Sequence, residues 1–302
     1  MSLNTYIIEG GLGKHIMFTA LIDQLVEKTG EPIQVHTPYV QVFAGNPKVK
    51  MAFDSVSIPL DDPRILESDE IIYCEPYKSN FVKGDEHLLE SYCNQLGIEY
   101  NTKVKPEIFT DFAKEDAKKW LEQFNITGKF IMIQMTGGQS PVVSDLNGEY
   151  VSSNAGRNYP PYFTNGLCEM IKQKYPDYTI IDCTLSNEPA YPFAIKCDAP
   201  WQVVNELLKM SEGFIAIDSC LQHMGAAEAV PGVVVWGNTR WNQFGWEQNK
   251  NVSFNMKEIN DRIKIDINDP RNIMVGPEFL FNVYEIMKRD KNEFETVECA
   301  HL

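Results

Sequence analysis

A glycine-rich run near the N-terminus, Gly10-Gly11-Leu12-Gly13-Lys14-His15, places residue types that could do chemistry next to one another. Glycines let the backbone approach a ligand closely, and a helix that follows them offers free N–H groups to an anion. The imidazole of His15 could remove a proton from an acceptor hydroxyl. The run has neither the Walker A spacing nor the third glycine of a dinucleotide-binding loop. A plain tight turn with a surface or capping histidine is the competing interpretation.

A second cluster, Asp218-Ser219-Cys220-Leu221-Gln222-His223, follows the apolar run Phe214 to Ile217 and opens a segment of small residues. Asp218 and Ser219 are expected at the carboxyl end of a strand, where the N–H groups of the next helix could hold an anion. The alternative is an ordinary helix cap, in which Asp218 or Ser219 satisfies those amides. For His223 we expect packing or hydrogen bonding beneath the helix.

A third group surrounds the run Phe130 to Met135, which ends in Thr136-Gly137-Gly138 and is followed by a long polar stretch from Gln139 to Tyr159. Such a stretch is too long for an ordinary connection, so we predict a functional loop. It contains Arg157, whose guanidinium could bind two phosphate oxygens at once. A solvated loop arginine is the alternative.

Alternating apolar runs and helical patterns must position these residues. The runs predict strands, the three-to-five-residue spacing predicts helices, and their alternation predicts a parallel sheet covered on both faces. Strands are predicted at 6–8, 33–35, 55–58, 70–74, 130–135, 178–183, 214–217 and 233–236. Helices are predicted at about 16–28, 87–96, 114–124, 162–174, 201–210, 221–229 and 277–288.

The pattern restarts after residues 125–129, which predicts two Rossmann-like α/β domains facing each other across a cleft. We expect an acceptor-binding domain over 1–125 and a nucleotide-sugar-binding domain over 126–275. The segment 276–302 is expected to hold a helix that packs back on the first domain. In open α/β sheets, ligands bind outside the carboxyl ends of the strands.

The charge balance disfavours an extensive nucleic-acid surface, because 42 acidic residues outnumber 27 basic ones and the net charge is −15. No apolar run is long enough to span a bilayer. The N-terminus lacks the features of a signal peptide, and seven scattered cysteines do not form a Cys-x-x-Cys pair. We therefore expect a cytoplasmic protein with reduced thiols.

These motifs together resemble the GT-B glycosyltransferases. The Asp218-Ser-x-x-x-His223-x-Gly-Ala-Ala segment, followed by Val233 to Thr239, is similar to the C-terminal signature of glycosyltransferase family 9, the ADP-heptose-dependent lipopolysaccharide heptosyltransferases. Gly156-Arg157-Asn158-Tyr159-Pro160 resembles that family's Lys-Arg-Trp-Pro segment. The family has an Asp directly after its glycine turn, where this chain has Lys14. Gly-Gly-x-Gly-x-His is closer to the peptidoglycan N-acetylglucosaminyltransferases, another GT-B group.

The resemblance implies that a nucleotide-diphosphate sugar binds the second domain. The predicted donor-binding residues are Thr136, Gly137, Gly138, Arg157, Asp218, Ser219, Cys220, Leu221, Trp236, Gly237 and Asn238. The predicted acceptor-side loop is Gly10, Gly11, Leu12 and Gly13.

The implied reaction is transfer of the sugar to an acceptor hydroxyl, with His15 as base, Glu9 as the next candidate and Lys14 in the position of the usual Asp. No metal and no cofactor are expected. Asp61-Asp62 and Asp266-x-x-Asp269 are interpreted as surface turns because prolines adjoin them. The acceptor could be a glycan, a lipid-linked molecule, a protein or a modified base. A nucleotide-sugar epimerase and a catalytically decayed nucleotide-sugar-binding protein are the alternatives.

Overall fold

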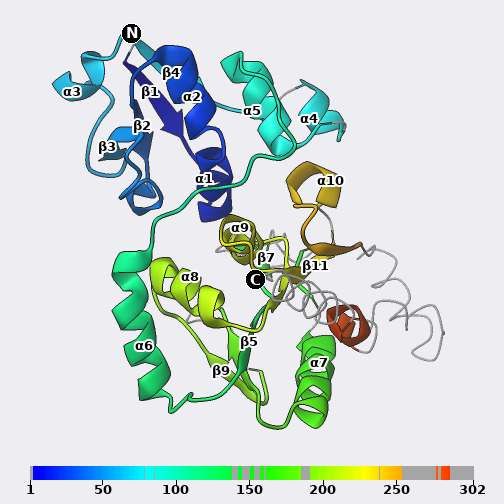
Figure 1. Ribbon diagram of the computed structural model, residues 1–302. Coiled ribbons are helices and arrows are strands. Elements are labelled where there is room, and N and C mark those ends of the chain that lie inside the picture. Colours follow the sequence, from blue (N-terminus) through cyan, green and yellow to red (C-terminus); the bar gives the residue numbers. More distant parts are fainter. Residues whose placement is uncertain are drawn as a thin grey trace, which may run out of the picture. The chain divides into compact units, whose positions relative to one another are not determined.

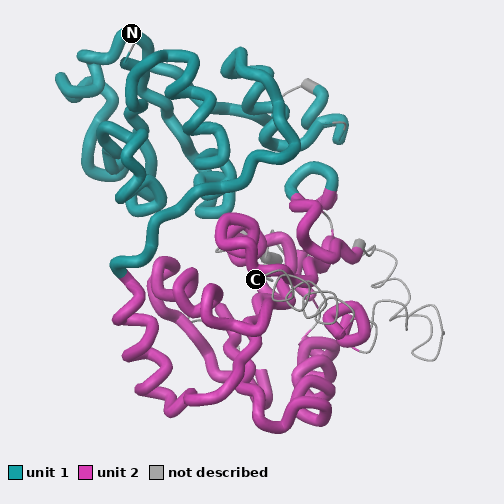
Figure 2. Tube along the Cα trace, viewed as in Figure 1, with its two compact units in different colours: residues 1–112, 242–244 teal, residues 113–241, 245–302 magenta. Residues whose placement is uncertain are grey.

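The computed structural model describes residues 3–77, 79–84, 86–137, 142–144, 150–152, 157–159, 161–184, 191–237, 239–253, 277 and 280–285. The chain divides into two compact units (Figures 1 and 2). Unit 1 comprises Met1–Phe112 and Asn242–Phe244, and unit 2 comprises Ala113–Trp241 and Gly245–Leu302. The expected assignment of 1–125, 126–275 and 276–302 to separate binding roles stays a prediction.

Unit 1 is built on a parallel sheet with the strand order β3-β2-β1-β4. The strands are β1 (Asn4–Ile8), β2 (Ile33–Thr37), β3 (Val49–Asp54) and β4 (Glu70–Cys74). Strands β1 and β2 are buried along their whole length, as expected for strands covered on both faces. Register places Ile8 beside Cys74, so the carboxyl ends of β1 and β4 are adjacent.

Unit 1 has two helices, α1 and α2, where the sequence predicted a single helix at about 16–28. Residues 20–21 separate the two helices. The helices are α1 (Leu12–Thr19), α2 (Ile22–Thr29), α3 (Pro63–Leu66), α4 (Ser79–Lys83) and α5 (Leu88–Leu96), with a 3₁₀ turn η1 (Val40–Val42). Residues 242–244, in the short helix α10 (Trp241–Phe244), complete the unit through a hydrogen bond from Gln243 Nε2 to the Phe81 carbonyl at 2.7 Å.

Unit 2 contains a parallel sheet with the strand order β12-β11-β10-β5-β8-β9 and a separate antiparallel hairpin, β6-β7. The strands are β5 (Phe130–Gln134), β6 (Val142–Ser144), β7 (Tyr150–Ser152), β8 (Thr179–Asp182), β9 (Ala194–Lys196), β10 (Phe214–Ile217), β11 (Gly232–Trp236) and β12 (Lys250–Ser253). The helices are η2 (Asp111–Ala113, at the unit boundary), α6 (Lys114–Gln123), α7 (Pro161–Lys174), α8 (Trp201–Met210) and α9 (Cys220–Ala227).

The core of unit 2 follows the two-residue alternation of its strands. Residues 131, 133, 215, 217, 233 and 235 face one side, where they form a buried cluster with α7 and with residues 280, 281 and 284. Phe214 points to the other side, where its ring lies against Gly225 of α9. The described part of the terminal helix thus contributes to the core of unit 2. No helix in the described ranges is long and apolar enough to cross a membrane.

Candidate active site

In each sheet the order in which successive strands are added reverses next to the first strand. Most of the predicted site residues lie at this reversal. In unit 2 the chain runs from β5 to β8 and β9 on one side, and then to β10, β11 and β12 on the other. This is the 3-2-1-4-5-6 order of Rossmann-type sheets, whose ligand crevice lies between the first and fourth strands. Unit 1 has the corresponding order 3-2-1-4, which places its reversal between β1 and β4.

The reversal in unit 2 brings together residues from three distant parts of the chain. Gly137 follows β5 and its N–H donates to Asn158 Oδ1 at 3.0 Å, which ties the Arg157 segment to the strand end. Arg157 Nη1 lies 3.9 Å from Asp218 Oδ2, just after β10. A Cβ on Gly137 would lie 3.7 Å from Ser219 Oγ and 3.0 Å from Ile217 Cδ1, so glycine allows the two strand ends to approach.

Asp218 is almost completely buried, and burial raises the pKa of its carboxyl group, an effect that Thr239, Arg157 and Gln222 partly offset. Gln222 Nε2 donates to Asp218 Oδ1 at 3.2 Å. His223, also buried, accepts a hydrogen bond at Nδ1 from Trp246 Nε1 at 2.9 Å. His223 thus hydrogen-bonds inside unit 2.

The start of α9 is not capped by Ser219, whose side chain makes no capping hydrogen bond. Instead, Gln134 at the end of β5 accepts the Leu221 N–H at Oε1, at 3.2 Å. Gln134 is not among the predicted site residues, although a polar residue near the end of an apolar strand is a usable signal. Cys220 is half-buried beside it, and Thr136 and Leu221 are buried.

Trp236 lies at the end of β11, fully buried, and donates from Nε1 to Asn251 Oδ1 at 2.9 Å. This places the indole in the packing of unit 2, and a nucleotide-lining role at this strand end would fall to the half-buried Gly237. Gly138 and Asn238 lie outside the described residues.

The reversal in unit 1 places Glu9, directly after β1, beside β4. Glu9 is exposed, and its Oε2 accepts a short hydrogen bond from the hydroxyl of Tyr73. Lys14, in the first turn of α1, is 8% exposed, and its Nζ lies 4.7 Å from the centre of the Tyr77 ring. Burial lowers the pKa of Lys14, while Glu75, Cys74 and Glu9 oppose that shift. The exposed Glu9 carboxylate and the buried Lys14 ammonium group are thus close enough for Glu9 to affect the pKa of Lys14.

His15 is fully buried, and both ring nitrogens face backbone carbonyls that flank Glu9. Nδ1 lies 2.9 Å from the Gly11 oxygen and Nε2 lies 3.0 Å from the Ile8 oxygen, while Tyr39 packs on the ring. Burial lowers the pKa of His15, against the effect of the two carbonyls. An imidazole enclosed in this way is placed to hold the glycine turn, whereas Glu9 is exposed. Of the glycines in this turn, Gly10 has a φ of 104°, which favours glycine.

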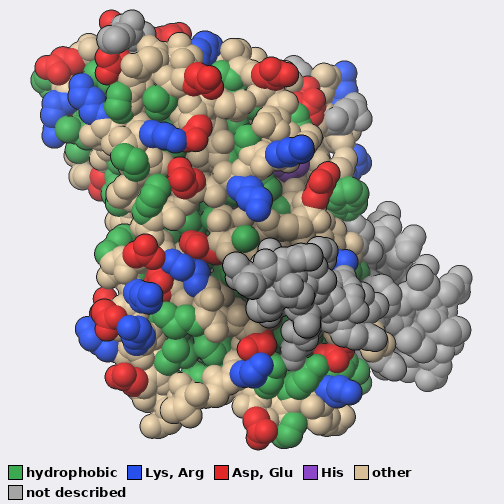
Figure 3. Space-filling view, in the orientation of Figure 1, with side chains coloured by type: hydrophobic (Ala, Val, Ile, Leu, Met, Phe, Trp, Pro, Cys, Tyr) green, Lys and Arg blue, Asp and Glu red, His purple; other side chains and the backbone are tan. Residues whose placement is uncertain are grey.

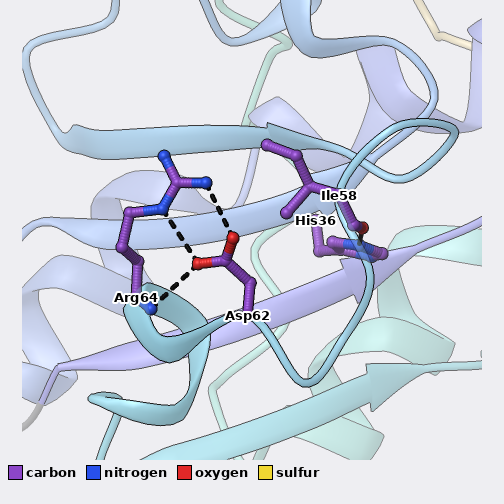
Figure 4. A network of polar contacts seen from close by, with 4 residues as sticks. All are labelled: His36, Ile58, Asp62 and Arg64. Atoms are coloured by element: carbon purple, nitrogen blue, oxygen red, sulfur yellow. Dashed lines mark hydrogen bonds and ion pairs between the residues drawn. The ribbon is translucent and has the colours of Figure 1, made fainter.

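Of the neighbouring Asp61 and Asp62, the second has a structural partner in Arg64. Asp62 caps α3 by accepting the Arg64 N–H at 3.0 Å, and the Arg64 side chain binds both of its oxygens (Figure 4). The arginine lowers the pKa of Asp62 to about 2. Within the described ranges, no three His, Cys, Asp or Glu side chains are grouped to hold a metal ion. Asp266 and Asp269 lie outside those ranges.

The described surface shown in Figure 3 carries acidic and basic side chains interspersed, with no continuous basic area on that face.

Two units with parallel sheets and covering helices define the fold of the GT-B glycosyltransferases, and comparison with solved structures bears this out. A family 9 glycosyltransferase from Veillonella parvula DSM 2008 aligns with a TM-score of 0.69 and 14% identity, over 96% of this chain and 97% of its own. Escherichia coli ADP-heptose lipopolysaccharide heptosyltransferase II aligns with a TM-score of 0.67 and 12% identity, over 97% of this chain and 100% of its own.

Escherichia coli heptosyltransferase WaaC, solved with ADP, aligns with a TM-score of 0.51 and 10% identity, over 87% of this chain and 97% of its own. No protein-family model matches the sequence, and no curated protein matches it. The predicted GT-B architecture and its likeness to family 9 structures are therefore confirmed as a likeness of fold.

Proposed function

We propose that this protein is a glycosyltransferase that takes its sugar from a nucleotide-diphosphate donor. The observation that carries the proposal is the cluster at the reversal of the unit 2 sheet, where Arg157 lies beside Asp218 and Gly137 approaches Ser219 at the start of α9. Helix N-termini and guanidinium groups bind phosphate oxygens, and a sheet reversal is where ligands bind. An ADP complex of a protein with this fold supports the same assignment.

In the proposed reaction, an acceptor hydroxyl attacks the anomeric carbon of the donor while the bond to the diphosphate breaks. Glu9 in unit 1 accepts the hydroxyl proton. Arg157 and the first amides of α9 stabilise the charge that develops on the leaving diphosphate, which is electrostatic catalysis. His15 acts as a positioning residue, because it contacts the carbonyls on either side of Glu9 and Gly10.

The position of Glu9 argues against the alternative of a catalytically decayed nucleotide-sugar-binding protein. That alternative was based on Lys14 in the position of the family's usual Asp. A carboxylate, that of Glu9, is present at the reversal of unit 1 even so, in the same segment after β1 as Lys14. Catalysis is therefore favoured over a decayed site.

The test is thermal stabilisation of the purified chain by ADP, UDP, GDP and their sugar conjugates, including ADP-heptose. A ligand at 100 times its dissociation constant adds about 2.7 kcal/mol to the free energy of unfolding. Arg157→Ala should weaken donor binding by roughly 1.5 to 3 kcal/mol, a factor of about 10 to 150, because a charge-assisted hydrogen bond to phosphate is lost.

The matched control is Arg64→Ala, which removes an arginine paired with Asp62 in unit 1 and should leave donor binding unchanged. If no nucleotide stabilises the chain, the proposal fails. Donor binding without release of nucleoside diphosphate, in the presence of glycan, lipid-linked and peptide acceptors, would instead favour a binding protein.

A further inference from the structure

Lys14 is a buried lysine whose ammonium group makes no hydrogen bond and no ion pair with the described residues of the chain. The residue is 8% exposed, its Nζ lies over the ring of Tyr77, and Nζ itself is not fully enclosed. By contrast, Lys48 of the same unit donates from Nζ to Asp23 Oδ1 at 2.6 Å. An ammonium group has three N–H donors, so those of Lys14 are available to a ligand.

The Lys14 side chain lies back over the glycine turn that precedes α1. A Cβ on Gly10 would lie 3.2 Å from Lys14 Cδ and 4.0 Å from Nζ. Gly10 also has a φ of 104°, a conformation that favours glycine. Because Gly10 has no side chain, the lysine can lie close to the backbone of the turn.

The same turn forms the start of α1, and no described side chain caps it. Gly11 occupies the N-cap position without a capping hydrogen bond, and the first turn of the helix has no acidic residue. The first N–H groups of a helix lack acceptors within the helix and carry a partial positive charge. The Lys14 N–H donates to the Gly11 carbonyl at 3.1 Å, so the donors at this end are the N–H groups of Leu12 and Gly13. The turn therefore presents two amides and one ammonium group.

We propose that this glycine turn binds a phosphate group, either as free phosphate or as the phosphate ester of a small molecule. Helix N-termini that follow glycine-rich turns are anion-binding sites, and a lysine adds a point charge for phosphate. One phosphate has enough oxygens to accept from the ammonium group and from both amides, whereas a carboxylate has two. The site uses residues of unit 1 alone and does not depend on the proposed glycosyl transfer.

Two carboxylates near Lys14 affect the charge of the site. Glu75 and Glu9 oppose the lowering of the Lys14 pKa by burial, and so help to keep the ammonium group charged. Each already accepts a hydrogen bond, Glu9 from the Tyr73 hydroxyl and Glu75 from the Tyr77 N–H at 3.1 Å. Neither forms an ion pair with Lys14, so both are farther from Nζ than a bound phosphate would be. Their negative charges weaken phosphate binding, and this effect provides a test of the site.

The test measures the binding of inorganic phosphate to the full chain carrying Arg157→Ala, which removes the cation proposed to bind phosphate in unit 2. Isothermal titration calorimetry gives the affinity, and hydrogen–deuterium exchange followed by mass spectrometry locates the phosphate. We expect phosphate to slow the exchange of a peptide that includes Leu12 and Gly13. In the same chain, Lys14→Met should weaken the binding about 10- to 150-fold, because a charge-assisted hydrogen bond is lost.

Lys48→Met is the matched control, because the Lys48 ammonium group is paired with Asp23 and phosphate binding should not change. Glu75→Gln should tighten the binding about two- to fivefold, and it tests the site independently of any effect of Lys14→Met on folding. Glucose 6-phosphate distinguishes the two sources of the phosphate group. A site for phosphate esters binds it more tightly than inorganic phosphate, and a site for free phosphate binds it more weakly.

Three results would overturn the inference: loss of phosphate binding with Arg157→Ala, no protection of the peptide that includes Leu12, or acetate bound as tightly as phosphate. The first would place the phosphate in unit 2 and leave the proposed function standing. Protection of this peptide by phosphate, in a chain that no nucleotide stabilises, would refute the proposed function alone.

Discussion

Replacing Gly225 by alanine tests how closely α9 lies on its sheet. A Cβ at this position would lie 2.4 Å from Phe214 Cε1, 2.8 Å from Cζ and 3.1 Å from the Val230 carbonyl oxygen. Ordinary carbon contacts are about 3.5 to 4.0 Å, so the ring would have to move by roughly 1 Å. The ring is fully buried, and a Cβ on Gly232 would approach it equally closely, so there is little room for movement.

Two effects oppose each other in Gly225→Ala. Alanine is favoured over glycine inside a helix by about 1 kcal/mol. Overpacking a buried site costs about 1 to 3 kcal/mol, and the short distances to an enclosed ring place this site near the upper value. We therefore expect a net loss of about 2 kcal/mol in the free energy of unfolding.

Urea unfolding followed by tryptophan fluorescence measures this loss selectively, because all five tryptophans, at 120, 201, 236, 241 and 246, belong to unit 2. The midpoint should fall by roughly 1 M. Gly128→Ala is the control, since its Cβ would meet only the Asp177 oxygen at 3.6 Å, and the change should stay within about 0.5 kcal/mol. Phe214→Leu should reduce the cost of Gly225→Ala by about 1 kcal/mol or more. A Gly225→Ala chain as stable as wild type would refute the close approach of α9.

Two further predictions concern the titratable groups of the two units. Burial lowers the pKa of His15 below its ordinary value of 6.5, so the unfolded chain takes up a proton first as the pH falls. As the pH is lowered from 6.5, the free energy of unfolding should therefore decrease, by at most about 1.4 kcal/mol per pH unit. The variant His15→Gln should show a smaller decrease per pH unit in urea titrations followed by circular dichroism. An equal decrease in wild type and variant would contradict the prediction. Asp218→Asn removes a buried negative charge 3.9 Å from Arg157 and should tighten ADP binding by roughly 1 kcal/mol, about fivefold, in isothermal titration calorimetry. Weaker ADP binding would show that the Asp218 carboxylate itself supports the nucleotide site.

Apolar runs predicted the buried strands and most helices well. The strand at 70–74, the strand at 214–217 and the helix at 201–210 have the bounds that the sequence indicated. Strand β10 is buried along its whole length, and α8 buries Val203, Leu207 and Leu208, so their apolar pattern follows directly from burial. Strand β4 is an edge strand in which only Cys74 is buried, and its run of apolar residues indicated the strand all the same. The edge strands β9 and β12 were missed, since strands of three and four residues give little pattern.

The strand predicted at 55–58 was wrong, and the side chain of Asp54 explains why. The strand is β3 (Val49–Asp54), and the chain then turns, because Asp54 Oδ1 accepts the Val56 N–H at 3.0 Å and Oδ2 accepts from Ser57 Oγ at 2.9 Å. The alternation of polar and apolar residues from Ser55 to Ile58 is typical of a strand, whereas the mixed polar and apolar residues of β3 gave no such pattern. Local hydrogen bonds of an Asp decided the boundary.

Sequence spacing placed Gly137, Arg157, Asp218 and Ser219 in separate segments, and only the strand order brings them together. The contacts of Gln134 and Tyr73 could not be read from spacing, since each joins residues more than 60 positions apart. The burial of His15 was also hidden, because a histidine after a glycine turn suits either a reactive or an enclosed position.

The hydrogen bond between Trp246 and His223 determines which ring nitrogen carries the proton. An indole N–H only donates, so Nδ1 of His223 must offer its lone pair, and the ring proton resides on Nε2. Nε2 lies 3.4 Å from the amide nitrogen of Gln222, the residue that also contacts Asp218. Both nitrogens are then donors, so their 3.4 Å approach is not a hydrogen bond, and the Gln222 amide nitrogen is left to donate to the buried Asp218 carboxyl group. A neutral His223 leaves α9 without a cationic side chain.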